Sequence, residues 1–168
     1  KTFLNGGQLT IPGLGALGPN PGSATPDFVY FGGGILVLTN DQTFTGGNRG
    51  LTVGSAGTLY LNATNTVSVV NDLNGGGNFT KWGIGTLILG GNNAFAGNVY
   101  FDGTSASAND GVTRIVSPTA LANVPVNPGV ATLFQGNNNS GWSTVELDGT
   151  AGSISLAQDW SMNCRNND

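Results

Sequence analysis

Two carboxylates on one short run have the spacing that a glycoside-cleaving enzyme uses. Glu146 and Asp148 lie two residues apart in STVELDG, an alternating run that predicts a β-strand, so both side chains should point to the same outward face. Their Cα atoms would lie about 6.6–6.8 Å apart, which is compatible with the carboxylate pair of an inverting glycosidase. Nothing in the sequence supplies an apolar pocket that would raise the pKa of either group. A solvated strand face is the simpler interpretation of this pair.

Other routes to catalysis need residues that the chain lacks. It contains no His, which excludes Ser-His-Asp and Cys-His chemistry. Cys164 is the one cysteine, with Arg165 as its nearby cation, so we expect an inert thiol and no intrachain disulfide. The glycines of WGIGTLILGG (82–91) are followed neither by the Gly-Lys-Ser/Thr of a phosphate loop nor by a helix. The sequence therefore predicts no catalytic residue.

A loop with two acidic residues is the candidate for metal binding. Asp102 and Asp110 flank GTSASAN, and Asp side chains in loops are common Ca²⁺ ligands. Their spacing matches no calcium-binding loop motif, and the GGxGxDx repeat of calcium-binding β-rolls is absent. We therefore expect neither a metal nor another cofactor.

Aromatic residues are the strongest candidates for binding. Tyr60 and Tyr100 alternate with core positions in their runs, so their rings should point outward, where a flat apolar face can stack on a sugar ring. The alternative is that these rings pack on neighbouring side chains or cover an edge of the fold. The candidates for a glycan-binding surface are Trp82, Trp142, Trp160, Tyr60 and Tyr100.

The charge pattern excludes two classes of partner. Charged residues make up 8% of the chain and the net charge is −4, with the five cations scattered along the sequence. Nucleic acids and anionic membrane surfaces attract clustered cations, so we expect neither partner. The sequence also has no apolar run long enough to span a membrane, which predicts no membrane insertion in this segment.

The elements that must position these residues are short β-strands. The 29 glycines are tolerable only if most lie at turns, because each costs about 0.5–1 kcal/mol in regular structure. Between the turns, apolar residues alternate with polar ones over three to five positions, which is typical of half-buried strands. Such pairs occur at Leu9/Ile11, Leu51/Val53, Leu59/Leu61, Val67/Val69, Leu87/Leu89, Val99/Phe101, Val145/Leu147 and Ile154/Leu156.

The spacing of these strands favours a solenoid. Leu51, Leu59 and Val67 lie eight residues apart, and so do Phe79 and Leu87. Strands this short and evenly spaced predict a right-handed parallel β-helix, in which each coil rests on the next at about 4.8 Å. An antiparallel β-sandwich of the carbohydrate-binding kind is the second possibility.

The chain also contains an internal similarity. LTIPGLGALGPNPG (9–22) is similar to RIVSPTALANVPVNPG (114–129), since each has a short strand, an Ala-Leu pair and a Pro-rich turn that ends in Asn-Pro-Gly. We therefore interpret residues 1–168 as a single β-solenoid segment, with one repeat over about 1–110 and a second that begins near 111. We also expect the chain to be a piece of a longer repeat protein.

One stretch resembles a known family. NFTKWGIGTLILGGNNAFAGNVYFDG (78–103) resembles the autotransporter-associated β-strand repeat, although Trp82 replaces a small or polar residue and Phe95 replaces the usual Tyr. The resemblance implies a right-handed parallel β-helix in a large secreted or surface protein of bacteria, where such repeats form stalks or display scaffolds. The matching positions are Phe79, Thr80, Lys81, Gly83, Gly85, Thr86, Leu87, Leu89, Gly91, Asn93, Phe95 and Gly97.

Three functional hypotheses follow. The first is a non-catalytic structural or adhesive segment that is extracellular or on the cell surface. The second is a glycan-binding module whose partner is a polysaccharide or a host or cell-surface glycan. The third is a polysaccharide-active β-helix enzyme. Because the ends of a solenoid fragment expose strand edges, we also expect self-association through those ends.

Overall fold

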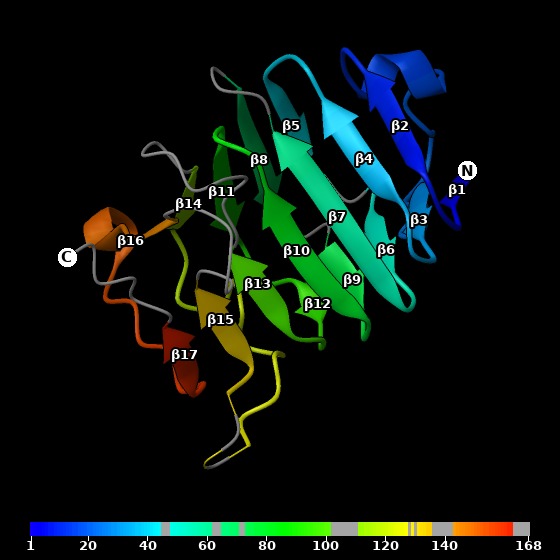
Figure 1. Ribbon diagram of the computed structural model, residues 1–168. Coiled ribbons are helices and arrows are strands. Elements are labelled where there is room, and N and C mark those ends of the chain that lie inside the picture. Colours follow the sequence, from blue (N-terminus) through cyan, green and yellow to red (C-terminus); the bar gives the residue numbers. More distant parts are fainter. Residues whose placement is uncertain are drawn as a thin grey trace, which may run out of the picture.

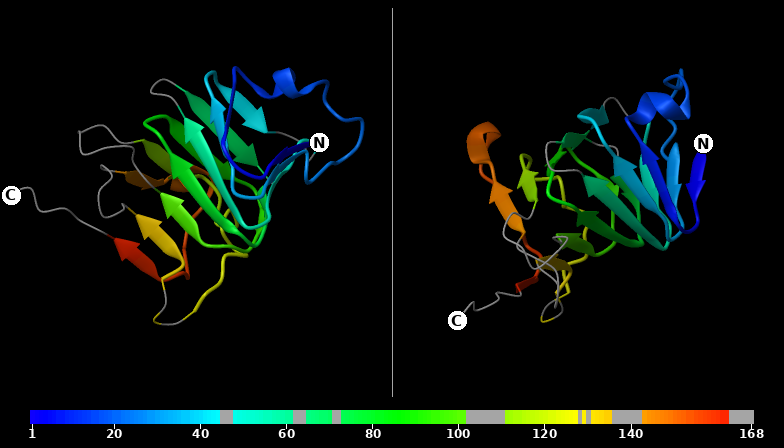
Figure 2. Two further views of the ribbon diagram at one scale, coloured as in Figure 1. Left: turned by 45° about the vertical axis from the view of Figure 1, so that its right-hand side comes forward. Right: turned by 45° about the horizontal axis from the view of Figure 1, so that its top comes forward.

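The computed structural model describes residues 1–44, 48–61, 65–70, 73–101, 111–127, 129, 131–135 and 143–162, apart from the side chains of Tyr60, Leu61, Phe134 and Gln135. The described chain forms three parallel β-sheets that wind around one core (Figures 1 and 2). All strand pairs between neighbours in these sheets are parallel, which rules out the antiparallel sandwich. The predicted parallel β-solenoid is confirmed, and its right-handed sense stays a prediction.

The chain visits the three sheets in turn. Sheet 1 has the order β1 (Thr2–Leu4), β3 (Val29–Phe31), β6 (Leu51–Val53), β9 (Leu73–Gly75) and β12 (Ala94–Phe95). Sheet 2 has the order β2 (Gln8–Ile11), β4 (Ile35–Leu38), β7 (Ala56–Leu61), β10 (Asn78–Trp82), β13 (Val99–Phe101), β15 (Leu133–Gln135) and β17 (Trp160–Met162). Sheet 3 has the order β5 (Gln42–Phe44), β8 (Thr66–Val70), β11 (Thr86–Gly90), β14 (Val112–Ile115) and β16 (Thr144–Leu147).

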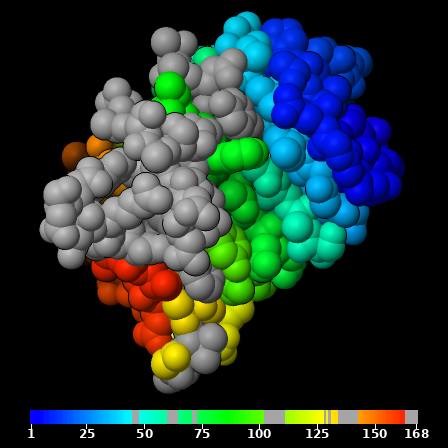
Figure 3. Space-filling view, in the orientation of Figure 1, coloured from blue at the N-terminus to red at the C-terminus, as the bar shows by residue number. Residues whose placement is uncertain are grey.

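The eight-residue spacing in the sequence corresponds to the step from a strand of one sheet to the next strand, which belongs to the next sheet. Leu51 lies on sheet 1, Leu59 on sheet 2 and Val67 on sheet 3, so the three residues mark the three sides of one coil. Each of them is fully buried. Figure 3 shows the consequence, because segments of successive colour lie next to one another from one end of the molecule to the other.

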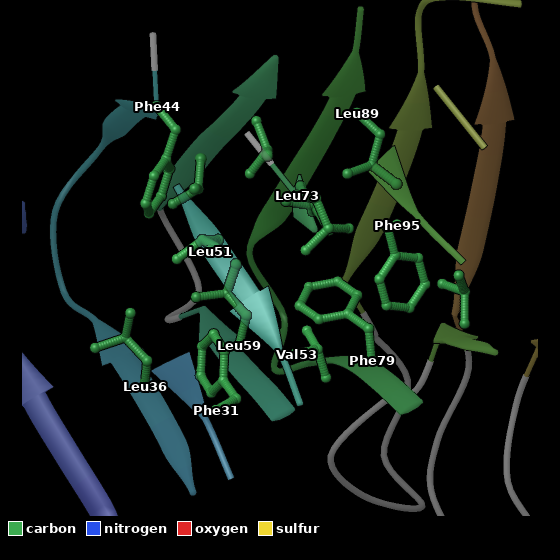
Figure 4. Close-up of a cluster of buried hydrophobic side chains, with 14 of the residues drawn as sticks. Phe31, Leu36, Phe44, Leu51, Val53, Leu59, Leu73, Phe79, Leu89 and Phe95 are labelled. Atoms are coloured by element: carbon green, nitrogen blue, oxygen red, sulfur yellow. The ribbon is translucent and has the colours of Figure 1, made fainter. Parts of the chain in front are cut away.

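The core is the space that the three sheets enclose. Alternate residues of each strand point into it, because side chains on a strand alternate between its two faces. Figure 4 shows Phe31, Leu59, Phe79 and Phe95 among the side chains that meet there, and each is at most 1% exposed. Burial of such side chains along the whole axis is the main stabilising term, at about 25 cal/mol for each Å² of apolar surface.

Corners between the sheets use glycine and asparagine for separate reasons. Gly75 has a φ of +95°, and a Cβ at that position would overlap the backbone of Val53 in the coil before it. Asn93 is buried at the corner after β11, where its side chain satisfies backbone groups of the coils on either side. Buried turns of this kind need such partners, because water does not reach their amides and carbonyls.

Coil length varies where segments are inserted. The register in sheet 2 advances by 20 residues from Phe79 to Val99 but by 34 from Val99 to its partner Leu133. The longer coil contains residues 114–129, whose strand β14 belongs to sheet 3, whereas the similar segment 9–22 begins on β2 in sheet 2. The two similar segments therefore lie on different faces, and the division into a first and a second repeat stays a prediction.

One predicted strand is absent. Residues 152–159 between the short 3₁₀-helix η2 (Gly149–Ala151) and β17 are irregular, although Ile154 and Leu156 pack partly buried against the core. The alternating pattern thus placed both side chains correctly. No strand forms there, because sheet 1 ends at β12 in the described part of the chain and offers no neighbouring strand at that level.

Candidate functional site

The outer face of sheet 2 brings two candidate aromatic residues into register, Trp82 and Tyr60, whereas Tyr100 lies opposite Thr80 of β10. Trp82 on β10 pairs with Tyr60 on β7, and Tyr100 on β13 pairs with Phe134 on β15. Trp82 and Tyr100 are half-buried and alternate with the buried residues of their strands. The outward position predicted for Tyr100 agrees with this alternation. The backbone of Tyr60 lies at the position of β7 that pairs with the outward Trp82.

Trp160 is separated from that surface. It pairs with Leu133, which is fully buried, so its strand position faces the core. Its indole stacks on Phe101 with ring centroids 5.7 Å apart and an interplanar angle of 23°. Trp160 therefore covers one end of the core, which is the alternative role considered for the aromatic residues. Trp142 lies outside the described residues.

An aromatic pair lies on the outer face of sheet 1, and sequence reasoning missed its exposed member, Phe3. Phe3 is 59% exposed and pairs with Tyr30 on the next strand, with ring centroids 5.7 Å apart. The same outward row continues through Thr52 and Asn74, which are half-buried. The alternation of Phe3 with the buried Leu4 is the signal that could have identified it.

Lys81 lies inside the solenoid. It is 1% exposed and pairs with Leu59 and Phe101, both core residues. Its Nζ donates a hydrogen bond to the carbonyl oxygen of Gly83 at 2.5 Å, at the corner that leads to β11. Burial of an ammonium group is tolerable only with such partners. Lys81 has the same parity as Phe79, so the alternation itself indicated an inward position.

The candidate glycosidase pair has other partners. The carboxylate of Glu146 accepts a hydrogen bond from Arg114 Nε at 2.7 Å on the outer face of sheet 3. Asp148 caps η2, where its Oδ1 accepts from the backbone N–H of Thr150 at 3.1 Å. Hydrogen bonds from Thr150 lower the pKa of Asp148 below its usual value of 3.8. A general acid needs a raised pKa, so this environment works against the acid role for Asp148.

The remaining candidates fall outside the described part of the chain. Asp102 and Asp110 lie in the range 102–110, and Cys164 lies in 163–168. Among the residues that the structure does describe, no three His, Cys, Asp or Glu side chains gather closely enough to hold a metal ion. Within that same part, no helix has the length and apolar character to cross a membrane.

The fold defines the class of the chain as a parallel β-solenoid, and one comparison relates it to a known protein. A stretch of 90 residues, 54% of this chain, is 37% identical to the Adhesin BmaC autotransporter of Brucella suis biovar 1 (strain 1330). That stretch spans 2% of the length of the adhesin. The chain is thus similar to a small part of an autotransporter adhesin, and its solenoid is consistent with a passenger repeat. No protein-family model matches the chain. No solved structure matches it.

Proposed function

We propose that the chain is a non-catalytic adhesive segment of an exported bacterial protein, located outside the cell or on its surface. The observation that carries the proposal is the 37% identity to an autotransporter adhesin over 54% of the chain. The fold supports it, because a continuous solenoid is a stiff scaffold whose outer rows are not needed for stacking. Its stability resides in inward rows and corners, which leaves the outer faces available for contact with a target.

The carboxylates of the enzyme hypothesis have structural roles, which favours the non-catalytic proposal. Glu146 forms an ion pair with Arg114, and Asp148 caps η2. We expect no reducing ends and no unsaturated products after incubation with a panel that includes pectin and alginate. Product formation that Glu146→Gln abolishes would overturn the non-catalytic assignment.

Adhesion is tested with beads that carry the folded chain. Coated beads should bind cultured epithelial cells or immobilised matrix proteins more strongly than beads that carry Phe79→Asp. Phe79 is fully buried beside Phe95, with ring centroids 6.1 Å apart, so a charge at position 79 disrupts the coil stack. Equal binding by both kinds of bead, or binding by neither, would contradict an adhesive role that depends on the fold.

A glycan ligand is the second candidate, favoured by two pairs of aromatic positions on the outer face of sheet 2. Half-buried Trp82 and Tyr100 offer ring faces for stacking on sugars, next to the backbone positions of Tyr60 and Phe134. On a glycan array, Trp82→Ala should weaken binding, whereas Trp160→Phe should leave it unchanged because position 160 faces the core. Equal losses in both variants, or no binding by the unchanged chain, would remove this candidate.

A further inference from the structure

Arg49 carries a positive charge that no acidic side chain of the described chain neutralises. The nearest acidic residues in the sequence are Asp27 and Asp41. Asp27 forms an ion pair with Lys1 at 2.8 Å, and the Oδ1 of Asp41 accepts a hydrogen bond from the backbone N–H of Thr66 at 2.7 Å. The charge of Arg49 is therefore available to an acidic group of another molecule.

The chain holds the guanidinium group of Arg49 in place at the corner before β6. Its Nη2 donates a hydrogen bond to the carbonyl oxygen of Gly18 at 2.8 Å, and the neighbouring Asn48 donates to the carbonyl oxygen of Pro21 at 3.0 Å. The Cζ of Arg49 lies 5.3 Å from the ring centroid of Phe28, so the cation also rests on an aromatic face. A group fixed in this way loses little conformational freedom when a ligand binds, which favours affinity.

The Nε–H group of Arg49 has spare hydrogen-bonding capacity. It is buried and finds no acceptor among the described residues. Nearly all buried N–H groups in folded proteins have a partner, so an unpaired one indicates a position where an acceptor fits. The guanidinium group offers five N–H donors in a planar fork, and this fork matches the two oxygens of a carboxylate.

A small cavity lies beside this side chain. Its volume is about 180 Å³, and Asn20, Thr43, Phe44 and Arg49 line it. Pockets for drug-sized ligands have volumes of roughly 300–1,000 Å³, so this cavity, which we call the Arg49 pocket, suits a single charged group. Asn20 and Thr43 are exposed, so their amide and hydroxyl groups can form hydrogen bonds with polar atoms next to that charged group.

We propose that the Arg49 pocket binds a carboxylate group, carried by a small organic acid or by an acidic sugar. The fixed cation and its unpaired Nε–H group select the negative charge, and the amide of Asn20 and the hydroxyl of Thr43 contact the atoms next to it. One cation suits one carboxylate, whereas a polyanion such as nucleic acid binds clustered cations. The proposal does not depend on adhesion, because it concerns the chemistry of this pocket alone.

An NMR titration of the isotope-labelled 168-residue chain tests the proposal, because the Nε–H group of Arg49 gives a signal of its own. Sodium glucuronate and sodium acetate are the carboxylate probes, glucose is the neutral control, and sodium chloride at equal ionic strength controls for screening. Both carboxylates should shift the Arg49 signal along a saturable curve, with a Kd on the order of 1 mM. Tighter binding of glucuronate supports an acidic sugar as the source of the carboxylate, and equal affinities support a small organic acid.

Substitutions then locate the site. Arg49→Gln should weaken glucuronate binding by about tenfold or more, and Arg49→Lys by about threefold, because Lys keeps the charge but loses the planar fork. Asn20→Ala changes an exposed residue, so it should keep the fold and weaken glucuronate binding severalfold even if the Arg49 variants unfold. Arg114→Gln is the matched control, because the guanidinium of Arg114 is already paired with Glu146 at 2.7 Å. It should bind as the unchanged chain does.

Several results would overturn the proposal. The first is an Arg49 signal that neither acid moves, or that glucose or chloride moves as far. The second is glucuronate binding of unchanged strength in Asn20→Ala, or in an Arg49→Gln variant that circular dichroism shows to be folded. The third is loss of binding in Arg114→Gln, which would place the carboxylate on the outer face of sheet 3 instead.

Discussion

Replacing Asn93 with Ala should lower the free energy of unfolding strongly, because this side chain forms hydrogen bonds to backbone groups of three coils. Asn93 is 1% exposed. Its Oδ1 accepts a hydrogen bond from the backbone N–H of Leu73 at 3.1 Å, in the coil before it. Its Nδ2 donates to the carbonyl oxygens of Gly90 and Ala120, both at 3.1 Å, and Ala120 lies in the coil after it.

The magnitude follows from the three backbone groups that would lose their partner. Each buried polar group without a hydrogen bond costs about 1–3 kcal/mol. Partial relaxation and entry of water at the corner reduce the sum, so Asn93→Ala should lower the free energy of unfolding by about 3–5 kcal/mol. Asn93→Asp should be at least as harmful, because its carboxylate keeps the acceptor for Leu73 but turns a negative charge towards two carbonyl oxygens.

Chemical denaturation followed by circular dichroism gives the free energies to compare. Asn78→Ala is the control, since Asn78 is exposed on β10 and its loss should change stability by no more than about 0.5 kcal/mol. Asn123→Ala should fall between the two, because its Nδ2 donates a single hydrogen bond to the backbone oxygen of Asn93 at 2.6 Å. A loss below about 1 kcal/mol in Asn93→Ala would refute the reasoning that the corner amides hold the coils together.

Three further predictions test other parts of the scaffold. Lys81→Met should lower the free energy of unfolding by about 1–3 kcal/mol, measured by the same denaturation, because a buried carbonyl oxygen loses its ammonium partner. Gly97→Ala should cost a similar amount, since its Cβ would overlap the carbonyl of Gly77 in the preceding coil; a melting temperature equal to that of the unchanged chain would contradict this. An NMR titration should place the pKa of Asp148 below 3.8. The stability from its bonds to Thr150 should therefore persist above that pH and disappear as the pH falls through the lowered pKa.

Much of the fold could be predicted from two features of the sequence. Alternation placed Leu87 and Leu89 inside, and both are fully buried. The eight-residue spacing of Leu51, Leu59 and Val67 indicated short strands joined by equal corners, which a solenoid needs and a sandwich does not. Both features are local, so they can be read without knowing which coils meet.

The register between coils could not be read in this way. Trp160 faces the core because β17 pairs with β15, and that pairing depends on coil lengths that range from 20 to 34 residues in sheet 2. The corner amides were missed for a related reason. Asn93 is one of many asparagines in the sequence, and only the positions of Leu73 and Ala120 show that it spans three coils.

Inward and outward positions of the strands have different structural requirements, so the candidate binding surface can change without a change in the core. Inward rows need side chains that are apolar or, like Lys81, hydrogen-bonded inside the core. Outward positions such as Trp82 and Tyr100 are free of that requirement, since the sheets pair through backbone groups whatever side chain points outward. Substitutions there should change binding without unfolding the coils. A half-buried Trp82 that contributed only to stability would show the opposite pattern, with Trp82→Ala lowering the free energy of unfolding and leaving adhesion of the folded chain intact.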